Sequence, residues 1–120
     1  MGPEDVGAPL RAPSSILGPC VLLLLAECPS HGYELADRVK GFGFPDSSAN
    51  SLYRELRRLE EAGLVSSSWH ADQARGPARR VYRLTGPGGD ALLGCADDAE
   101  ALGRMLERYV RRVRAARRRM

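Results

Sequence analysis

Near its middle, the chain changes from a helical to a strand-like hydrophobic pattern. In residues 50–63, leucines at positions 52, 56 and 59 and a glycine at position 63 fall on one face of a helix. Residues 64–70 then have the composition of a short strand, and residues 79–84 alternate, with Tyr82 and Leu84 on one side. A Gly-Pro pair between these two runs indicates a turn. The sequence therefore predicts an amphipathic helix followed by a β-hairpin.

Two shorter helices are predicted before this point. Residues 16–27 are strongly apolar and are soon followed by Pro29, so they predict a mostly buried helix. Ser30 or His31 can cap a second helix, which Gly41 and Gly43 end. Residues 1–13 contain prolines and glycines with little to bury, which is typical of a flexible arm.

A long helix with an apolar seam is predicted at the end of the chain. Residues 85–89 break the strand pattern, and the segment after them can form a helix of about thirty residues, roughly 45 Å long. Its apolar side chains recur at alternating steps of three and four, which is the heptad pattern of paired helices. We therefore expect a homodimer whose interface contains Leu92, Cys95, Ala99, Leu102, Leu106, Tyr109 and Val113.

Positive charge is concentrated at the C-terminal end. Residues 104–120 carry eight arginines and one glutamate, whereas residues 1–103 carry ten basic and fourteen acidic side chains. All the basic residues except Lys40 are arginine, whose guanidinium is suited to bidentate contacts with phosphate and guanine. The arginine-rich end has three interpretations, namely a solvated helix face, an additional contact to DNA phosphates, or a basic amphipathic helix at a membrane surface.

The sequence argues against several classes of protein. Its longest apolar run, Val21–Ala26, is far shorter than the roughly 20 residues of a membrane-spanning helix. Residues 1–13 have no apolar segment typical of a secretory signal, so we expect a cytoplasmic protein without a membrane partner. Three cysteines without a C-x-x-C pair argue against a disulfide framework. No metal-ligand spacing, nucleophile elbow or phosphate-binding loop is present, so no metal, cofactor or enzymatic activity is expected.

Three helices followed by a basic hairpin are typical of a winged helix-turn-helix domain that binds double-stranded DNA. We expect a mainly α (α+β) fold with a flexible arm (1–13), a domain with a two-stranded wing (14–86) and a dimerisation helix with an arginine-rich tail (87–120). The third helix can enter the major groove, and the hairpin can lie over nearby phosphates. The residues expected to read bases are Ser47, Asn50, Ser51 and Arg54, and those expected to hold phosphates are Tyr53, Arg57, Arg58, Arg75, Arg79 and Arg80.

Four segments, in order, make the chain similar to a known family. They are Leu-Gly at 17–18, His-Gly-Tyr-Glu-Leu at 31–35, residues 51–65 with the pattern L-Y-x-x-L-x-x-L-E-x-x-G-L-V, and residues 76–85 with R-x-Y-x-L-T. Over about residues 16–93, the chain resembles the PadR family of bacterial transcriptional regulators, and within it the smaller subgroup with a single C-terminal dimerisation helix. Where that family commonly has Ser-Pro-Gly-Thr, residues 48–51 are Ser-Ala-Asn-Ser.

The resemblance implies a homodimeric repressor on an inverted-repeat operator, often released by a small aromatic or drug-like effector. It implies that Tyr53 and the start of its helix, including Ser48, contact DNA, with Tyr33 near the DNA backbone. Two other functions remain open: a winged-helix module that binds an acidic protein, and a dimer that binds a ligand between its long helices without an operator. We expect Tyr33, Tyr82 and Trp69 to pack against the protein rather than stack on a ligand.

Overall fold

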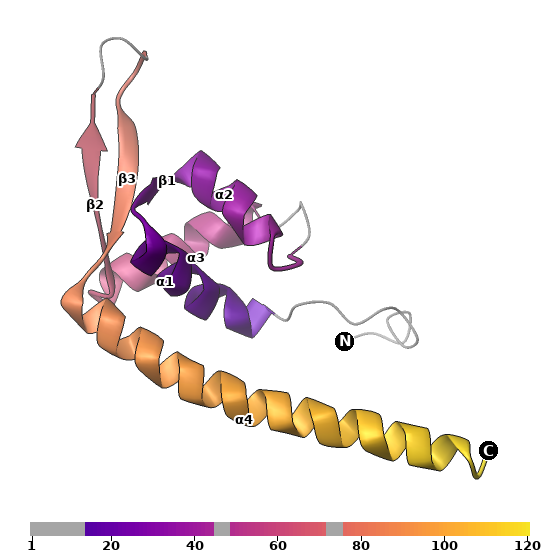
Figure 1. The fold of residues 1–120 in the computed structure, drawn as a ribbon. Coiled ribbons are helices and arrows are strands. Elements are labelled where there is room, and N and C mark those ends of the chain that lie inside the picture. The colour runs from indigo at the N-terminus through magenta and orange to yellow at the C-terminus, as the bar shows by residue number, and fades with distance from the viewer. Residues whose placement is uncertain (1–13, 45–48, 72–75) are drawn as a thin grey trace.

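The computed structural model describes residues 14–44, 49–71 and 76–120, so the predicted arm at 1–13 lies outside the described residues. Three short helices pack together, a hairpin projects beyond them, and a long helix runs along the opposite side (Figure 1). The elements in chain order are the 3-10 turn η2 (Ser14–Ile16), α1 (Leu17–Glu27), β1 (Ser30–His31), α2 (Gly32–Lys40), α3 (Ala49–Glu61), β2 (Val65–His70), β3 (Arg79–Leu84) and α4 (Gly86–Arg117).

The predicted mainly α winged-helix fold is confirmed, with one strand that the sequence did not reveal. Strands β2 and β3 pair antiparallel from Val65–Leu84 to His70–Arg79 and form the hairpin. The short β1 pairs with the other edge of β3, through Ser30–Tyr82 and His31–Val81. The sheet therefore has three strands in the order β1-β3-β2, and only the part formed by β2 and β3 projects as a wing.

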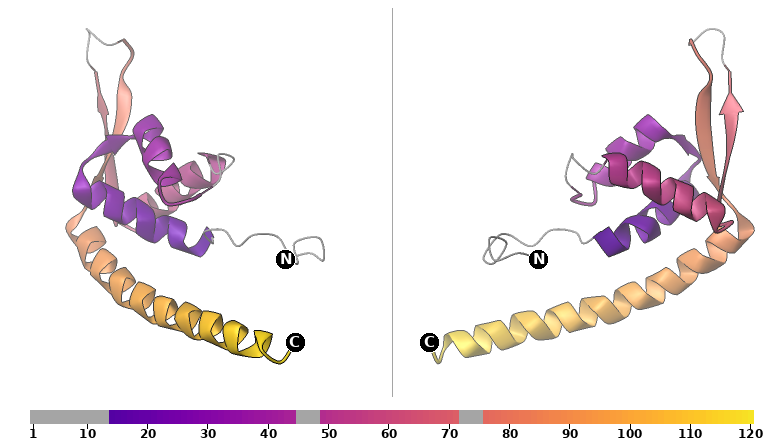
Figure 2. Two further views of the ribbon diagram at one scale, coloured as in Figure 1. Left: turned by 45° about the vertical axis from the view of Figure 1, so that its right-hand side comes forward. Right: turned by 180° about the vertical axis from the view of Figure 1, so that it is seen from behind.

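The core lies between the three short helices and the inner end of the sheet. All three leucines predicted to face inward from α3, Leu52, Leu56 and Leu59, are buried. They meet apolar side chains of α1 and α2 such as Val21 and Leu35, so the 3.6-residue period of α3 matches a real packing surface. Seen from behind in Figure 2, α3 lies in front of α1 and beside the wing, so its other face is turned outward.

Arg38 and His31 fix the connection between α1 and α2. The Arg38 guanidinium donates hydrogen bonds to the carbonyl oxygens of Leu24 (2.7 Å) and Cys28 (3.3 Å) and to Ser30 Oγ (2.7 Å). The Leu24 carbonyl also accepts from the Cys28 amide, so Arg38 adds a second hydrogen bond there and ties the end of α1 to β1. At the start of α2, His31 Nδ1 accepts from the Glu34 amide, and the Glu34 carboxylate accepts from the His31 amide, which makes a capping box. The N-terminus of α2 is therefore held next to β1 and β3.

Helix α4 begins earlier than predicted and is attached to the body at its start. The sequence placed residues 85–89 before the helix, whereas α4 starts at Gly86, because Pro87 is tolerated in a first turn and Thr85 caps it. Thr85 Oγ1 accepts from the Gly88 amide (3.1 Å) and donates to the Gly63 carbonyl (2.7 Å). A Cβ atom on Gly88 would lie 2.0 Å from the Leu64 carbonyl oxygen, so this contact requires glycine.

Within the described ranges, only the first turns of α4 pack on the rest of the chain. Ala91 and Leu92 contact the core and α4 packs against α1, whereas the later part of the helix extends away from the body. None of the helices in the described parts of the chain is long and apolar enough to cross a membrane.

Candidate nucleic-acid interface

The outward face of α3 is polar and basic. Asn50, Tyr53, Arg54 and Arg57 are exposed on the side opposite the buried leucines, and Ser51 is half-buried beside them. Arg54 Nη2 donates to Ser51 Oγ at 3.3 Å. Among the described residues, no carboxylate lies within ion-pair distance of Arg54 or Arg57. Both guanidinium groups are thus available to an external anion.

Arg58, which the sequence assigned to phosphate binding, is already paired within the protein. Its guanidinium forms an ion pair and two hydrogen bonds with the Glu55 carboxylate, one of them 3.1 Å long. Hydrogen bonding and charge attraction from Glu55 raise the pKa of Arg58. A Cβ atom on Gly18 would lie 2.5 Å from Glu55 Oε1 and 3.3 Å from Arg58 Nη2. The pair therefore lies over α1, at the flank of α3.

Arg80 connects the wing to the C-terminal half of α3. Its Nε donates to Ser67 Oγ at 2.8 Å, and its Nη2 lies 3.4 Å from Glu60 Oε1. Ser67 Oγ also donates to Glu60 Oε2 at 2.5 Å. The guanidinium lies over the Trp69 ring, 5.8 Å from its centroid, at a distance typical of a cation–π contact. This network sets the angle at which the wing leaves α3.

The start of α2 and the start of α3 meet through Gly32 and Tyr53. A Cβ atom on Gly32 would lie 2.7 Å from the Tyr53 hydroxyl oxygen and 3.0 Å from Tyr53 Cε1. Glycine at this position therefore lets the Tyr53 ring lie against the N-terminus of α2. The neighbouring Tyr33 is 79% exposed.

Arg79 lies across from His31, at the junction of the wing and α2. Arg79 Nη1 is 3.2 Å from His31 Nε2, which is also 3.2 Å from Glu34 Oε1. Because His31 Nδ1 accepts the Glu34 amide, a neutral ring carries its hydrogen on Nε2. Arg79 and His31 Nε2 then face each other as two donors, and Arg79 has no carboxylate partner in the described part of the chain.

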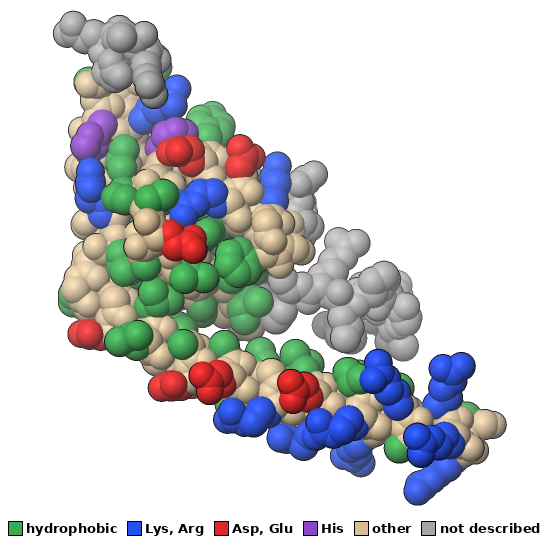
Figure 3. Space-filling model, viewed as in Figure 1, with side chains coloured by type: hydrophobic (Ala, Val, Ile, Leu, Met, Phe, Trp, Pro, Cys, Tyr) green, Lys and Arg blue, Asp and Glu red, His purple; other side chains and the backbone are tan. Residues whose placement is uncertain are grey.

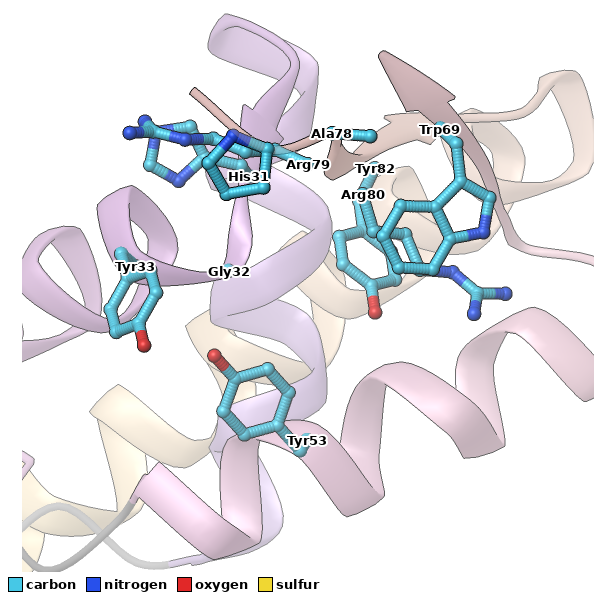
Figure 4. Close-up of a pocket in the computed structure, with 10 residues that line it drawn as sticks. His31, Gly32, Tyr33, Tyr53, Trp69, Ala78, Arg79, Arg80 and Tyr82 are labelled. Atoms are coloured by element: carbon cyan, nitrogen blue, oxygen red, sulfur yellow. The ribbon is translucent and has the colours of Figure 1, made fainter. Parts of the chain in front are cut away.

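Between α2, α3 and the wing lies a concave surface of about 520 Å³, called here the wing groove. Figure 4 shows the rings of Tyr53, Tyr82 and Trp69 around one opening, with Tyr33 on the far side. The lining of the wing groove includes His31, Tyr33, Tyr53, Trp69, Arg79 and Tyr82.

The aromatic residues of the groove differ from expectation in two of three cases. Tyr82 is buried as predicted, and burial raises the pKa of its hydroxyl. The expectation that Tyr33 and Trp69 pack against the protein is wrong, because they are 79% and 68% exposed. Tyr33 lies on α2, and Trp69 lies on β2 of the wing, where the Arg80 guanidinium covers part of its ring.

Three predicted interface residues, Ser47, Ser48 and Arg75, lie outside the described residues.

The residues of the predicted α4 seam differ in burial along the helix. Leu92 packs on the core of its own chain and Cys95 is half-buried, whereas the remaining seam residues are exposed: Ala99, Leu102, Leu106, Tyr109 and Val113.

Three short helices, an exposed basic face on the third and a projecting two-stranded wing define a winged helix-turn-helix protein. A family model described as the transcriptional regulator PadR-like family matches residues 21–93. Because this match covers more than half of the sequence, the chain belongs to the PadR-like family. It is therefore a DNA-binding transcription regulator with a winged-helix fold.

Solved structures agree with this assignment. A conserved protein of unknown function, TM0937, described as a potential transcriptional factor, is 35% identical, with a TM-score of 0.71 over 90% of this chain and 96% of that one. A PadR family transcriptional regulator from Eggerthella lenta DSM 2243 is 29% identical, with a TM-score of 0.60 over 78% and 82%. A PadR family transcription regulator from Clostridium difficile R20291 shares the fold at 23% identity, with a TM-score of 0.70 over 79% and 98%. No curated protein matches the chain.

Proposed function

We propose that the chain is a homodimeric repressor that binds an inverted-repeat operator. The observation that carries this proposal is the outward face of α3, where Asn50, Arg54 and Arg57 are exposed together and neither arginine is paired with a carboxylate among the described residues. A helix of this kind fits the major groove, in which asparagine pairs with adenine and arginine pairs with guanine. In bacteria the chromosome lies in the cytoplasm, so we propose that this regulator acts there.

The contacts that we propose follow the position of each side chain. Asn50, Ser51 and Arg54 lie at the start of α3 and read base edges, together with Ser47 on the preceding segment. Phosphates are held by Tyr53 and Arg57 on α3, Tyr33 on α2 and Arg79 on β3, together with Ser48 and Arg75. Arg58 and Arg80 reach phosphates only by leaving Glu55 and Glu60, so their main role is to hold α3 and the wing in position.

A second copy of the chain is the proposed partner of α4. Exposed apolar side chains continue along the helix well beyond the part that packs on its own body, and they include Leu102, Met105, Leu106, Tyr109, Val110 and Val113. A helix of 32 residues that packs only its first turns on the described part of its own chain leaves a seam for another helix to cover. Two wings related by a two-fold axis then match two half-sites about one turn of DNA apart.

Repression and release by an effector follow from the family resemblance. A dimer that occupies an operator within a promoter blocks transcription, and a small aromatic or drug-like molecule that favours a different form of the dimer restores it. The direction of regulation can be tested with the promoter that contains the selected operator.

Selection of bound fragments from a random duplex pool at about 0.15 M salt tests operator binding, with the mass of the protein measured in the same buffer. We expect an enriched palindrome and the mass of a dimer. Recovery of random fragments, with affinity that collapses as salt rises, would favour the alternative of a module that binds an acidic protein.

Substitution at Asn50 separates base reading from general attraction to DNA. Asn50→Ala is expected to cost about 1–3 kcal/mol on the selected operator and to relax the preference at one base pair. Arg79→Ala is the comparison, because loss of a phosphate contact weakens binding to all sequences alike. Equal losses for Asn50→Ala on operator and random DNA would remove Asn50 from the base-reading set.

A further inference from the structure

We propose that the arginine-rich end of α4 binds a second DNA duplex without sequence preference, so that one protein molecule bridges two duplexes. The binding surface, called here the arginine stripe, consists of Arg108, Arg111, Arg114 and Arg118. Binding of DNA to the arginine stripe can be tested without an operator. Bridging rests in addition on the proposed function, because the first duplex is the one that α3 holds.

The arginine stripe occupies one side of the end of α4. Its four members follow one another at steps of three, three and four residues and therefore share a helix face, which Arg118 extends as the C-cap in helical conformation. The same spacing places Leu106, Tyr109 and Val113 on the other side, and all these residues are exposed. A second copy of α4 can thus cover the apolar side and leave the arginine stripe open.

The positive charge of the arginine stripe is not compensated within the described chain. No described carboxylate lies within ion-pair distance of its members, whereas the neighbouring Arg104 lies 3.9 Å from Glu100. Like charges three or four residues apart destabilise a helix. The helix dipole favours only the arginines of the last turn, Arg114 and Arg117. A polyanion bound along the arginine stripe would relieve the repulsion over its whole length.

Pairing of two copies does not neutralise this end of the helix. Residues 104–120 carry eight arginines and one glutamate, which is a net charge of +7, whereas residues 86–103 carry four acidic side chains and no basic ones. If the acidic segment of a partner lies alongside, the seven surplus positive charges still exceed its four carboxylates by three. An additional anionic partner is therefore compatible with the dimer.

The chemistry of the arginine stripe fits phosphates best. Each guanidinium can hold a phosphate through two hydrogen bonds. The ten residues from Arg108 to Arg118 span about 15 Å of helix, over which a duplex carries about nine phosphate charges. A membrane-bound helix would need the apolar side that the proposed dimer covers. A protein partner is usually anchored by large apolar or aromatic side chains, which are lacking between these arginines.

The arginine stripe lies away from the surface that is proposed to read the operator. Helix α4 runs along the side of the body opposite the wing, and its end is far from the wing in each view (Figures 1 and 2). In Figure 3, basic side chains line the lower edge of α4, turned away from the body, and surround its end. A duplex held by α3 and the wing therefore leaves this surface open to another duplex.

Binding to the arginine stripe is measured in a background of Arg54→Gln and Arg57→Gln, which removes the unpaired arginines from the outward face of α3. We expect this variant to retain salt-dependent binding of a labelled random duplex in fluorescence anisotropy. Adding Arg111→Gln, Arg114→Gln and Arg118→Gln is expected to weaken this binding at least about tenfold at about 0.15 M salt. The slope of the logarithm of affinity against the logarithm of salt concentration is expected to fall by about three.

The matched control replaces the same three arginines by lysine. Lysine keeps the charges, so the salt slope is expected to stay unchanged. The mass of each variant is measured in the same buffer, and affinities are compared at concentrations at which all variants have the same mass. Unchanged affinity and salt slope in the glutamine variant would overturn the proposed site. Tighter binding of polyglutamate than of a duplex of equal charge would overturn it in favour of an acidic protein.

Bridging is measured with a duplex that carries the selected operator and is fixed to a surface. The full chain is bound first, and a labelled duplex without the operator is then added. We expect the chain to retain this second duplex, and the three glutamine substitutions in α4 alone to reduce its retention at least about tenfold. Equal retention by both proteins would overturn bridging.

The two proposals fail in different ways. A chain that selects an operator but shows no binding that depends on the arginine stripe would overturn the second DNA site alone. A chain that selects no operator but binds random duplexes through the arginine stripe would support this site and refute the proposed function instead.

Discussion

Gly32 controls where the Tyr53 ring can lie, and this can be tested by adding one methyl group. In Gly32→Ala, the new Cβ would lie 2.7 Å from the Tyr53 hydroxyl oxygen, so the ring must move away from α2. Because a side chain end moves more easily than backbone, we expect the free energy of unfolding to change by less than about 1 kcal/mol. DNA affinity is expected to fall several-fold, as measured by fluorescence anisotropy.

The matched background for this test is Tyr53→Ala, which removes the ring. If displacement of Tyr53 is the cause, Gly32→Ala has no further effect on DNA affinity in that background. Additive losses in the double variant would show that Gly32 acts independently of Tyr53.

Tyr82 is expected to make stability depend on alkaline pH. Burial raises the pKa of Tyr82 in the folded chain above its value of about 10 in the unfolded chain. The neutral hydroxyl therefore contributes stability that is complete below about pH 10 and is lost as pH rises through the folded pKa. Urea unfolding across pH 8–11 measures this loss, and Tyr82→Phe is expected to remove it. Burial also raises the pKa of Cys20, so the comparison uses a Cys20→Ala background.

A periodic pattern reveals inward-facing side chains, but it does not reveal which charged groups pair across the fold. The spacing of Leu52, Leu56 and Leu59 predicted the buried face of α3, because helix geometry alone determines it. The pairing of Arg80 with Glu60 could not be predicted, because it depends on where the wing crosses α3. Sequence reasoning therefore identified the basic face, but not which of its arginines are free.

At the junction between body and long helix, Thr85 is expected to fix the direction of α4. Its hydroxyl accepts from the Gly88 amide, which caps the helix, and donates to the Gly63 carbonyl. Thr85→Val removes this partner from both the amide and the carbonyl while keeping the shape of the side chain. We expect a loss of about 1–2 kcal/mol in the free energy of unfolding, measured with urea. Thr85→Ser keeps the hydroxyl and is expected to lose clearly less. Equal losses for the two variants would contradict the role of the hydroxyl.

Short strands escape detection for a different reason. Strand β1 has two residues, too few for alternation, and it forms because Ser30 is held by Arg38 beside β3. In the same way, Pro87 and its flanking glycines suggested a loop, whereas the cap at Thr85 makes them the first turn of α4. Element ends depend on hydrogen bonds to distant residues, which a local pattern does not contain.

The charge of α4 changes sign along its length, and this predicts how two copies pair. Residues 86–103 carry acidic side chains and no basic ones, while residues 104–120 carry eight arginines and one glutamate. Figure 3 shows acidic side chains along the first half of the helix and basic ones around its end. An antiparallel pair of helices places opposite charges side by side, whereas a parallel pair places like charges together. We therefore expect the proposed dimer to be antiparallel along α4.

Salt provides the first test, because screening weakens attraction and relieves repulsion. An antiparallel dimer is expected to dissociate more readily as salt rises from about 0.05 to 0.5 M, as measured by analytical ultracentrifugation, and a dimer that strengthens with salt would contradict this arrangement. Charge reversal within α4 is the second test. Replacing Arg108 and Arg112 with glutamate is expected to raise the dimer dissociation constant about tenfold or more. The same charge reversal at Arg57 and Arg83, outside α4, is the matched control and is expected to leave the dimer dissociation constant unchanged. A second variant replaces Asp97 and Asp98 with arginine. Next to the variant with glutamate at 108 and 112, it again places opposite charges side by side. We therefore expect these two variants to form mixed dimers with each other.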